Sequence, residues 1–351
     1  MTHYIGLDAH TQSCTFQGIT ERGKPSRLEV VKTSATELKR TVQLYPAPRI
    51  VCLEEGTSSE WLCEVLRPHV EKIYVVQPTT RAHFKSDAED ALDLAQQARR
   101  GPEAVIYKPD GLLSELRTAM RNYEECQNDV VRARNRFVAA FRARGVQLPK
   151  EYSEDDSREA LLELLKAPYS THAEALAKRM DAAIQAREEA ATWLVQASKK
   201  VDAVRWVSSV VGIGQIRAAQ IVAVVVTPHR FPRRSKFKSY SGLALRRYNS
   251  AQWRENDQGD LEWNTRSRKA QGLNFNRNPI LKRVFFGAAL TVKRMPDHPL
   301  GAHYRQLLAA GKDEQLVKAT IARKIALATL AVWKNKEVYD PAKHVARLEP
   351  A

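Results

Sequence analysis

The sequence predicts three successive parts: an α/β domain, a region of long helices, and a basic, mostly α-helical domain. Strand-like and helix-like segments alternate over residues 1–110. Helix-forming residues dominate residues 111–205, where no glycine occurs between Gly111 and Gly145. Residues 206–351 are rich in lysine and arginine. Changes of pattern on this scale are typical of domain boundaries.

The first part predicts a mixed sheet. Short strands are expected at residues 3–8, 13–20 and 28–32, and further apolar strands at residues 50–53 and 72–76. Helices are expected at residues 35–44, around Trp61 to Leu66, and from Asp87 onward. Three meandering strands followed by alternating helix and strand favour an α/β domain. This order is found in ribonuclease-H-like folds, and many other α/β folds would fit it equally well.

The middle part predicts two long helices. Apolar residues recur at helical spacing from Leu113 to Phe141, and Pro149 and Pro168 interrupt the region. A second long helix is expected over about residues 171–204. Amphipathic helices of balanced charge indicate an antiparallel coiled-coil hairpin or a dimerisation arm, with a plain helical bundle as the alternative.

The last part opens on a G-x-G turn, Gly212 to Gly214, which leads into an apolar stretch over residues 218–226. It ends in an expected amphipathic helix over residues 316–332. A G-x-G turn that opens a helix exposes backbone N–H groups at the positive end of the helix dipole, where phosphates bind. The turn resembles the hairpin of helix-hairpin-helix motifs, which grip the DNA backbone. An ordinary tight turn is the alternative.

The net charge of +16 is unevenly distributed. Residues 1–110 carry 14 basic and 15 acidic residues, and residues 111–200 carry 15 and 14. Residues 201–351 carry 27 basic and 11 acidic residues, so the whole excess lies there. Such a field favours a polyanionic partner, with a merely solvated basic surface as the alternative.

Residues 230–283 are the most basic segment, with 14 lysines and arginines against four acids. Tyr240, Tyr248, Trp253, Trp263 and Phe275 interleave with these charges, and aromatic faces stack on unpaired bases. The candidate nucleic-acid-binding residues are Gly212, Gly214, Arg233, Arg234, Lys236, Lys238, Arg246, Arg247, Arg277, Lys282 and Arg283.

The composition predicts a soluble cytoplasmic protein. No run of 18 apolar residues occurs, and the N-terminus lacks the pattern of a secretory signal. Cys14, Cys52, Cys63 and Cys126 form no C-x-x-C pair or zinc-like spacing. We therefore expect reduced thiols and no membrane partner.

Four carboxylates are candidate metal ligands. Asp8 ends the first expected strand, Glu54 ends a central strand, and Asp87 and Asp90 share one helix face. Carboxylate oxygens suit Mg²⁺ or Mn²⁺, and such clusters hold two ions about 4 Å apart for phosphodiester transfer. Surface acids are common at such positions. Glu55 competes with Glu54, and Asp93 could substitute on the helix.

A serine near arginines is a candidate nucleophile. Ser250 follows Arg246 and Arg247, and arginines can neutralise a phosphate that is under attack. Ser239, Ser241 and Ser267 lie in equally basic surroundings.

Taken together, these segments resemble the DEDD-type transposases of insertion sequences, the family numbered one hundred and ten. The resemblance covers nearly the whole chain in order. It rests on Asp8 at a strand end and on residues 53–57 (LEEGT), 85–91 (KSDAEDA), 211–214 (VGIG), 240–244 (YSGLA), 274–278 (NFNRN) and the helix around Lys324. The pattern differs at Val211, where the family usually has proline, and at Asn249 and Ala251, which flank Ser250.

The resemblance implies a RuvC-like N-terminal domain of the ribonuclease-H-like fold, in which Asp8, Glu54, Asp87 and Asp90 hold Mg²⁺ or Mn²⁺. It implies that Ser250 forms a covalent phosphoserine link to DNA. It further implies a homo-oligomer, a dimer or tetramer, guided to donor and target DNA by a structured non-coding bridge RNA.

The function expected from these features is that of a recombinase that excises and inserts an insertion sequence. Two alternatives remain from the residues alone. One is a hydrolytic Holliday-junction endonuclease, which needs the same acids but attacks with water. The other is a non-catalytic nucleic-acid-binding protein. The corresponding domains are residues 1–110, 111–205 and 206–351.

Overall fold

A computed structural model describes residues 1–78, 86–149, 155–247, 253–256, 258–263 and 270–346. The chain forms two compact units, Met1–Gly111 and Leu112–Ala351. The first is a mixed α/β domain and the second is mostly helical, as the sequence predicts. The second unit contains both the long helices and the basic helical part, and a domain boundary between residues 205 and 206 stays a prediction.

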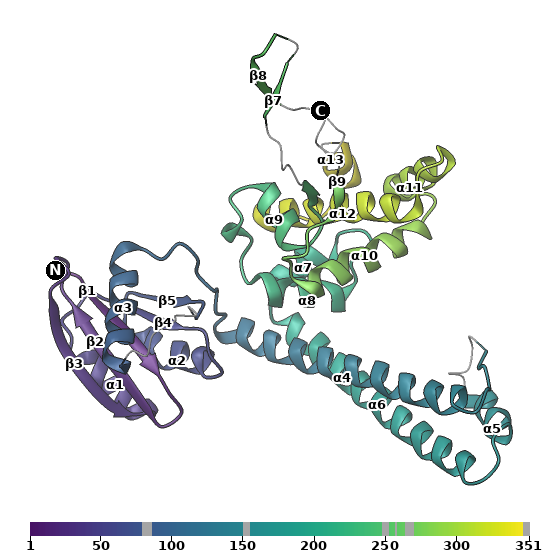
Figure 1. The fold of residues 1–351 in the computed structure, drawn as a ribbon, viewed down its shortest axis with the longest axis horizontal. Helices are drawn as coiled ribbons and strands as arrows, with labels where there is room; N and C mark the ends of the chain where they lie inside the picture. The colour runs from purple at the N-terminus through teal and green to yellow at the C-terminus, as the bar shows by residue number, and fades with distance from the viewer. Residues whose placement is uncertain (79–85, 150–154, 248–252, 257, 264–269, 347–351) are drawn as a thin grey trace. The chain divides into compact units, whose positions relative to one another are not determined.

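The first unit is built on a five-stranded sheet with the strand order β3-β2-β1-β4-β5 (Figure 1). Its strands are β1 (His3–Ala9), β2 (Ser13–Ile19), β3 (Pro25–Lys32), β4 (Arg49–Glu54) and β5 (Lys72–Val76). β1 to β3 pair antiparallel as a meander, whereas β1, β4 and β5 run parallel. The parallel strands are connected through helices, as crossover connections require.

Helices cover both faces of this sheet. The helices of the first unit are α1 (Ala35–Gln43), α2 (Ser59–Leu66), the 3-10 turn η1 (Arg67–His69) and α3 (Asp87–Arg100). α1 and α2 pack against one face, in a core that includes Ile5 and Leu53. α3 packs on the opposite face, where Leu94 meets Cys52. Parallel strands covered on both faces read as continuous apolar runs, which is why β4 and β5 were evident in the sequence.

Gly6 of β1 determines how closely α3 approaches the sheet. A Cβ atom on Gly6 would lie 1.7 Å from the carbonyl oxygen of Ala91. No larger residue fits there, because the backbone of α3 occupies the space. The segment of α3 at Ala91 and Ala95 therefore lies against the strand that carries Asp8.

The second unit begins with two long antiparallel helices, α4 (Gly111–Arg142) and α6 (Tyr169–Lys199), with α5 (Asp155–Glu163) between them in the chain (Figure 1). At one end Phe137 and Phe141 of α4 pack with Leu176 of α6. At the other end Glu115 pairs with Lys200 at 2.7 Å. The two helices form a hairpin, and coiled-coil packing within it stays a prediction.

The rest of the second unit is a helical core. Its helices are α7 (Asp202–Ser208), α8 (Gln215–Val225), the 3-10 turn η2 (Pro228–Arg230), α9 (Arg234–Tyr240), α10 (Pro279–Lys293), α11 (Pro299–Ala309), α12 (Glu314–Asn335) and α13 (Pro341–Ala346). The amphipathic helix expected over residues 316–332 corresponds to α12, whose buried residues, from Val317 to Trp333, cover one broad side, while Thr320, Arg323 and Lys324 are half-buried. Among the described helices, none combines the length and apolar character needed to cross a membrane.

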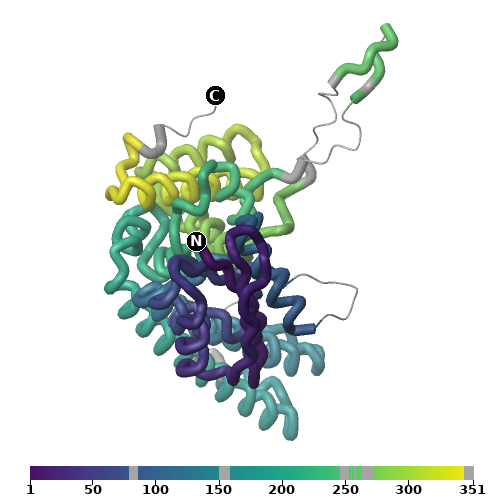
Figure 2. The backbone as a smooth tube through the Cα atoms, turned by 90° about the vertical axis from the view of Figure 1, so that its left-hand side faces the viewer, coloured from purple at the N-terminus to yellow at the C-terminus, as the bar shows by residue number. Residues whose placement is uncertain are grey.

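Short strands interrupt the helical core. β6 (Leu245–Arg247) pairs with β9 (Ala270–Leu273), and β7 (Trp253–Glu255) pairs with β8 (Leu261–Trp263). In both views the β7–β8 hairpin stands clear of the helices of its unit (Figures 1 and 2). Three of the four acids of the basic segment 230–283 lie on this hairpin, at Glu255, Asp260 and Glu262. The described remainder of the segment is therefore purely basic.

Candidate metal centre and nucleic-acid interface

Asp8 and Glu54 are neighbours at the carboxyl ends of two parallel strands. Leu7 of β1 pairs with Leu53 of β4, and Asp8 and Glu54 are the next residues on each strand. Paired strands lie about 4.8 Å apart, and side chains alternate between faces. Asp8 therefore shares the face of Gly6, and Glu54 shares that of Cys52, which is the face covered by α3.

Asp87 and Asp90 come to the same edge because α3 begins there. Ser86 caps the helix in a capping box, in which its side chain accepts from the backbone of Glu89 and the Glu89 carboxylate accepts from the backbone of Ser86. Acids in the first turn are favourable near the positive end of a helix dipole. This placement accounts for part of their presence, because a helix start attracts acids without any metal.

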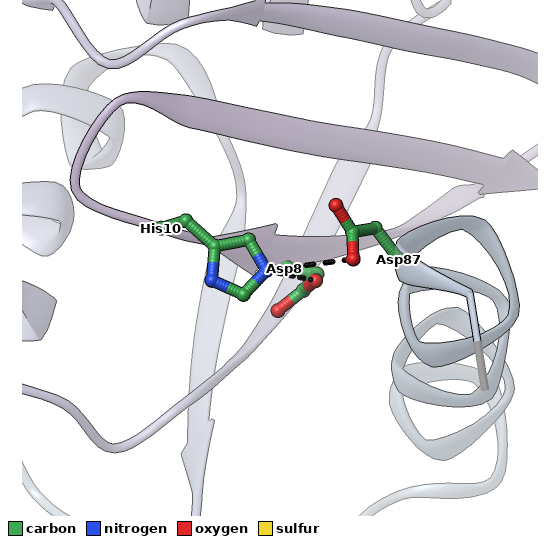
Figure 3. Close-up of side chains that lie close together, drawn as sticks. All are labelled: Asp8, His10 and Asp87. Atoms are coloured by element: carbon green, nitrogen blue, oxygen red, sulfur yellow. Dashed lines mark ion pairs between the residues drawn. The ribbon is translucent and has the colours of Figure 1, made fainter. Parts of the chain in front are cut away.

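The closest group at this edge is Asp8, His10 and Asp87 (Figure 3). Each offers one ligand atom, and these atoms lie within 4.8 Å of one another. His10 Nε2 is 3.1 Å from Asp8 Oδ2 and 3.6 Å from Asp87 Oδ1. The prediction from sequence missed His10. The available signal was its position two residues after Asp8, which places it on the same side of an extended chain.

The electrostatics of the edge favour a cation. Burial raises the pKa of Asp8, His10 lowers it, and the charges of Asp87 and Asp90 raise it further. A bound cation would stabilise the charged form of Asp8 against this burial and against the neighbouring negative charges. The donor set, carboxylate oxygens with an imidazole nitrogen, fits a divalent metal ion.

Glu54 and Glu55 differ clearly in their surroundings. The carboxylate of Glu55 pairs with Lys108 at 2.5 Å and accepts a hydrogen bond from Ser59 Oγ at 3.2 Å. Only 3% of the Lys108 side chain is exposed, so this ion pair is part of the packing of the unit. Glu54 is exposed at the strand end. Glu54 lies outside the three-residue group of Figure 3, and its role as a metal ligand stays a prediction.

In the second unit, the G-x-G turn joins α7 to α8. Gly212 has φ of 76°, and a Cβ on it would lie 2.6 Å from the carbonyl oxygen of Ala288. Gly214 is the N-cap of α8. Arg217 fixes the turn by donating to the Gly212 carbonyl at 2.7 Å and to Thr291 Oγ1 at 2.9 Å. The turn is therefore held on both sides, and its identity as a helix-hairpin-helix element stays a prediction.

A pocket of about 640 Å³ opens at the start of α8. It is lined by Tyr123, Gln127, Val195, Gly214, Gln215, Ile216, Arg217, Gln220, Arg283, Val284 and Gly287. Beneath it the buried carboxylate of Glu124 accepts from Gln220 at 2.6 Å and pairs with Arg283. Burial lowers the pKa of the Arg217 guanidinium, which nevertheless remains a cation at neutral pH. The pocket thus combines two arginines with the backbone N–H groups of a helix start.

The other predicted basic contacts lie in different settings. Arg233, Arg234 and Lys236 are exposed at α9, which is anchored by the buried ring of Phe237. Lys238 is half-buried. The Lys282 ammonium lies 5.4 Å from the centre of the Phe286 ring. Arg246 and Arg247 belong to β6, and their side chains lie outside the described part of the chain.

Two segments that carry the family resemblance in the sequence, residues 240–244 and 274–278, lie in contact with each other. Arg277 packs over Gly242, where a Cβ would lie 2.2 Å from its Cδ atom. The backbone N–H of Asn278 donates to the Tyr240 carbonyl at 2.8 Å, and the Asn274 amide donates to Ser239 Oγ at 3.0 Å. Arg277 therefore has a structural role beside any contact with nucleic acid. The loop presents the ring of Phe275 to solvent, with 70% of the residue exposed.

The candidate nucleophile Ser250 lies outside the described residues, as does Ser267. The two other serines are poor nucleophile candidates. Ser241 is fully buried, and Ser239 Oγ accepts a hydrogen bond from Asn274. In the sequence Ser250 falls between β6 and β9, which pair with each other at Leu245 and Leu273.

A mixed α/β sheet with carboxylates gathered at the ends of its parallel strands, joined in one chain to a basic helical unit, fits a DNA-processing enzyme, and the family matches show that class. A family model for DEDD-type IS110 transposases, described as a transposase, matches residues 5–143. A second model, described as the transposase IS116/IS110/IS902 family, matches residues 204–305. Together the two matches cover more than half of the chain, which belongs to the IS110 family of transposases. None of the curated proteins matches this sequence.

Proposed function

We propose that this enzyme is a recombinase that excises and inserts an insertion sequence, with a metal-dependent centre formed by Asp8, Glu54, Asp87 and Asp90. One observation carries the proposal: the ends of β1 and β4 meet the first turn of α3. The strand order, with an antiparallel meander beside parallel strands, supports a ribonuclease-H-like, RuvC-like fold for this unit.

Mg²⁺ or Mn²⁺, when bound by these carboxylates, would supply charge stabilisation at the phosphate under attack. The protein's own contribution is to hold the acids in register. The pairing of β1 with β4 sets Asp8 beside Glu54, and Gly6 sets the approach of α3 with Asp87 and Asp90. Preorganised ligands of this kind need no rearrangement during the reaction.

Ser250 is the proposed nucleophile. Its Oγ would attack the phosphorus of the scissile phosphodiester and form a phosphoserine ester, while the bond from phosphorus to one sugar oxygen breaks. The serine proton passes to a base or solvent, and the leaving sugar oxygen takes up a proton. The bond energy is conserved, so a hydroxyl of the partner strand can reverse the reaction on new DNA. Arg246 and Arg247 supply positive charge in the adjoining sequence.

The second unit is proposed to grip donor and target DNA together with a structured guide RNA, in a homo-oligomer. The pocket at α8 supports this role, because backbone N–H groups of a helix start, with Arg217 and Arg283 beside them, suit a backbone phosphate. The exposed ring of Phe275 is suited to stacking on an unpaired base.

The direct test is excision and insertion in bacterial cells, from a plasmid that carries the gene with its native flanking non-coding DNA. Deletion of that flanking DNA tests the guide RNA, because the protein alone should then fail. Recombination that persists without the flanking DNA would contradict the guide RNA while leaving the metal and serine chemistry open to test by substitution.

Glu54→Gln and Glu55→Gln are expected to behave oppositely. Glu54→Gln should abolish recombination and leave the melting temperature of the metal-free protein almost unchanged, because Glu54 is exposed. Glu55→Gln should lower stability by about 1–3 kcal/mol, since it leaves the buried Lys108 ammonium without a carboxylate, and should retain metal binding. Thermal melts and metal titrations of both variants measure this. The reverse pattern would make Glu55 the ligand.

Arg234→Ala and Lys236→Ala are expected to weaken nucleic-acid binding without changing the fold. Both side chains are exposed on α9. Each phosphate contact that is lost should reduce the slope of log affinity against log salt by about 0.9 on duplex DNA. Arg179→Ala on α6, an exposed arginine in the region of balanced charge, is the matched control. An equal change in the control would mean that only net charge matters.

A further inference from the structure

His10 lies where a third ligand of a metal ion would lie. Its Nε2 atom is 3.1 Å from Asp8 Oδ2 and 3.6 Å from Asp87 Oδ1, and Figure 3 shows the ring turned toward both carboxylates. In an octahedral site with ligands at about 2.1 Å, adjacent ligand atoms lie about 3.0 Å apart. The two spacings from His10 are therefore near that of adjacent ligands of one ion, and all three ligand atoms lie within 4.8 Å of one another.

The backbone of His10 is held on both sides. Its N–H donates to the carbonyl of Ser13 at 2.9 Å, which closes the turn between β1 and β2. Its carbonyl accepts from Thr33 Oγ1 at 2.8 Å. Only the side-chain torsions of His10 remain free, so little conformational entropy is lost when the imidazole is held beside the carboxylates.

We propose that His10 is a nitrogen ligand of the ion held by Asp8 and Asp87, and that it makes the site select Mn²⁺ over Mg²⁺. This inference rests on the metal centre of the proposed function. Mg²⁺ is a hard ion that prefers oxygen ligands, whereas imidazole suits first-row transition metals. A cluster of carboxylates alone would discriminate less between the two ions.

The test is a metal titration of the purified full-length protein without DNA. Free Mn²⁺ is followed by electron paramagnetic resonance, and Mg²⁺ binding is followed by its competition with Mn²⁺. His10→Ala should weaken Mn²⁺ binding roughly ten-fold and change Mg²⁺ binding less than roughly two-fold. His10→Asn offers an oxygen donor and should keep Mg²⁺ binding while losing the preference for Mn²⁺. His229→Ala, at an exposed histidine of the second unit, is the control.

Electron spin-echo spectra of bound Mn²⁺ give a second measurement. The wild type should show modulation from a coordinated nitrogen, and both His10 variants should lack it. Unchanged modulation and affinity in His10→Ala would overturn the role of His10, even if Asp87→Asn abolishes Mn²⁺ binding and so supports the proposed centre. If Asp8→Asn and Asp87→Asn both bind Mn²⁺ like the wild type, the proposed metal centre itself fails.

Discussion

Asp8→Asn is expected to reduce excision and insertion by at least about a thousand-fold, which corresponds to about 4 kcal/mol of lost transition-state stabilisation. Asp8 lies centrally, beside Glu54 in the strand register and within reach of His10 and Asp87. Asparagine has nearly the same shape, so the packing is retained while the negative charge that would bind the cation is removed. The measurement is recombination frequency in cells at matched protein levels.

Stability provides the control for Asp8→Asn. Burial raises the folded-state pKa of Asp8, so its ionised form destabilises the metal-free fold at pH values above the unfolded-state pKa. That penalty is relieved as the pH falls through the folded-state pKa. At neutral pH the metal-free variant should therefore melt at the same temperature as the wild type or higher. Mn²⁺ should raise the melting temperature of the wild type and not that of the variant. Full recombination by Asp8→Asn would mean that these carboxylates are ordinary surface charges with no part in the reaction.

The local pattern of the sequence predicts most of the first unit, because each strand there has a clear chemical signal. β4 and β5 are apolar runs, and β5 has the predicted bounds, residues 72–76. Ser86 and Glu89 indicate the helix start at Asp87, because they form a capping box that depends only on neighbours in the chain. The acids of the candidate centre were proposed from their positions at strand and helix ends together with the family resemblance.

The sequence alone could not predict features that depend on residues far apart in the chain. Glu54 and Glu55 look alike until Lys108, far along the chain, is found to pair with one of them. The contact of His10 with Asp87 depends on how α3 docks over Gly6, which no local pattern encodes. Long-range packing decides such contacts, and a single sequence contains little direct information about it.

The helical unit differs from expectation for related reasons. The long helix expected to reach residue 204 ends at Lys199, and α7 starts at Asp202, although neither glycine nor proline marks the break. α12 covers the amphipathic helix expected over residues 316–332, and its buried side is broad because small residues such as Ala319 and Ala322 are buried together with the large apolar ones. Alanine is compatible with both environments, so periodicity alone is a weak guide where alanine is common.

Ser250→Ala is expected to reduce recombination below detection while leaving DNA and RNA binding intact. The substitution removes the oxygen that would form the phosphoserine ester and so conserve the bond energy. The wild type, mixed with substrate DNA and denatured, should yield a covalent protein–DNA species that Ser250→Ala lacks. Ser239→Ala is the matched control, because Ser239 Oγ already accepts a hydrogen bond from the side-chain amide of Asn274.

The comparison of Ser250→Ala with Asp8→Asn separates the competing chemistries. If both variants are inactive and equally well expressed, a joint metal and serine mechanism stands. If Ser250→Ala still cleaves a synthetic four-way junction and only Asp8→Asn is inactive, water is the nucleophile and the enzyme is a hydrolytic junction endonuclease. If Ser250→Ala loses nucleic-acid binding as well, the serine supports the interface. The covalent adduct formed by the wild type identifies the nucleophile directly, because the phosphorylated peptide can be sequenced.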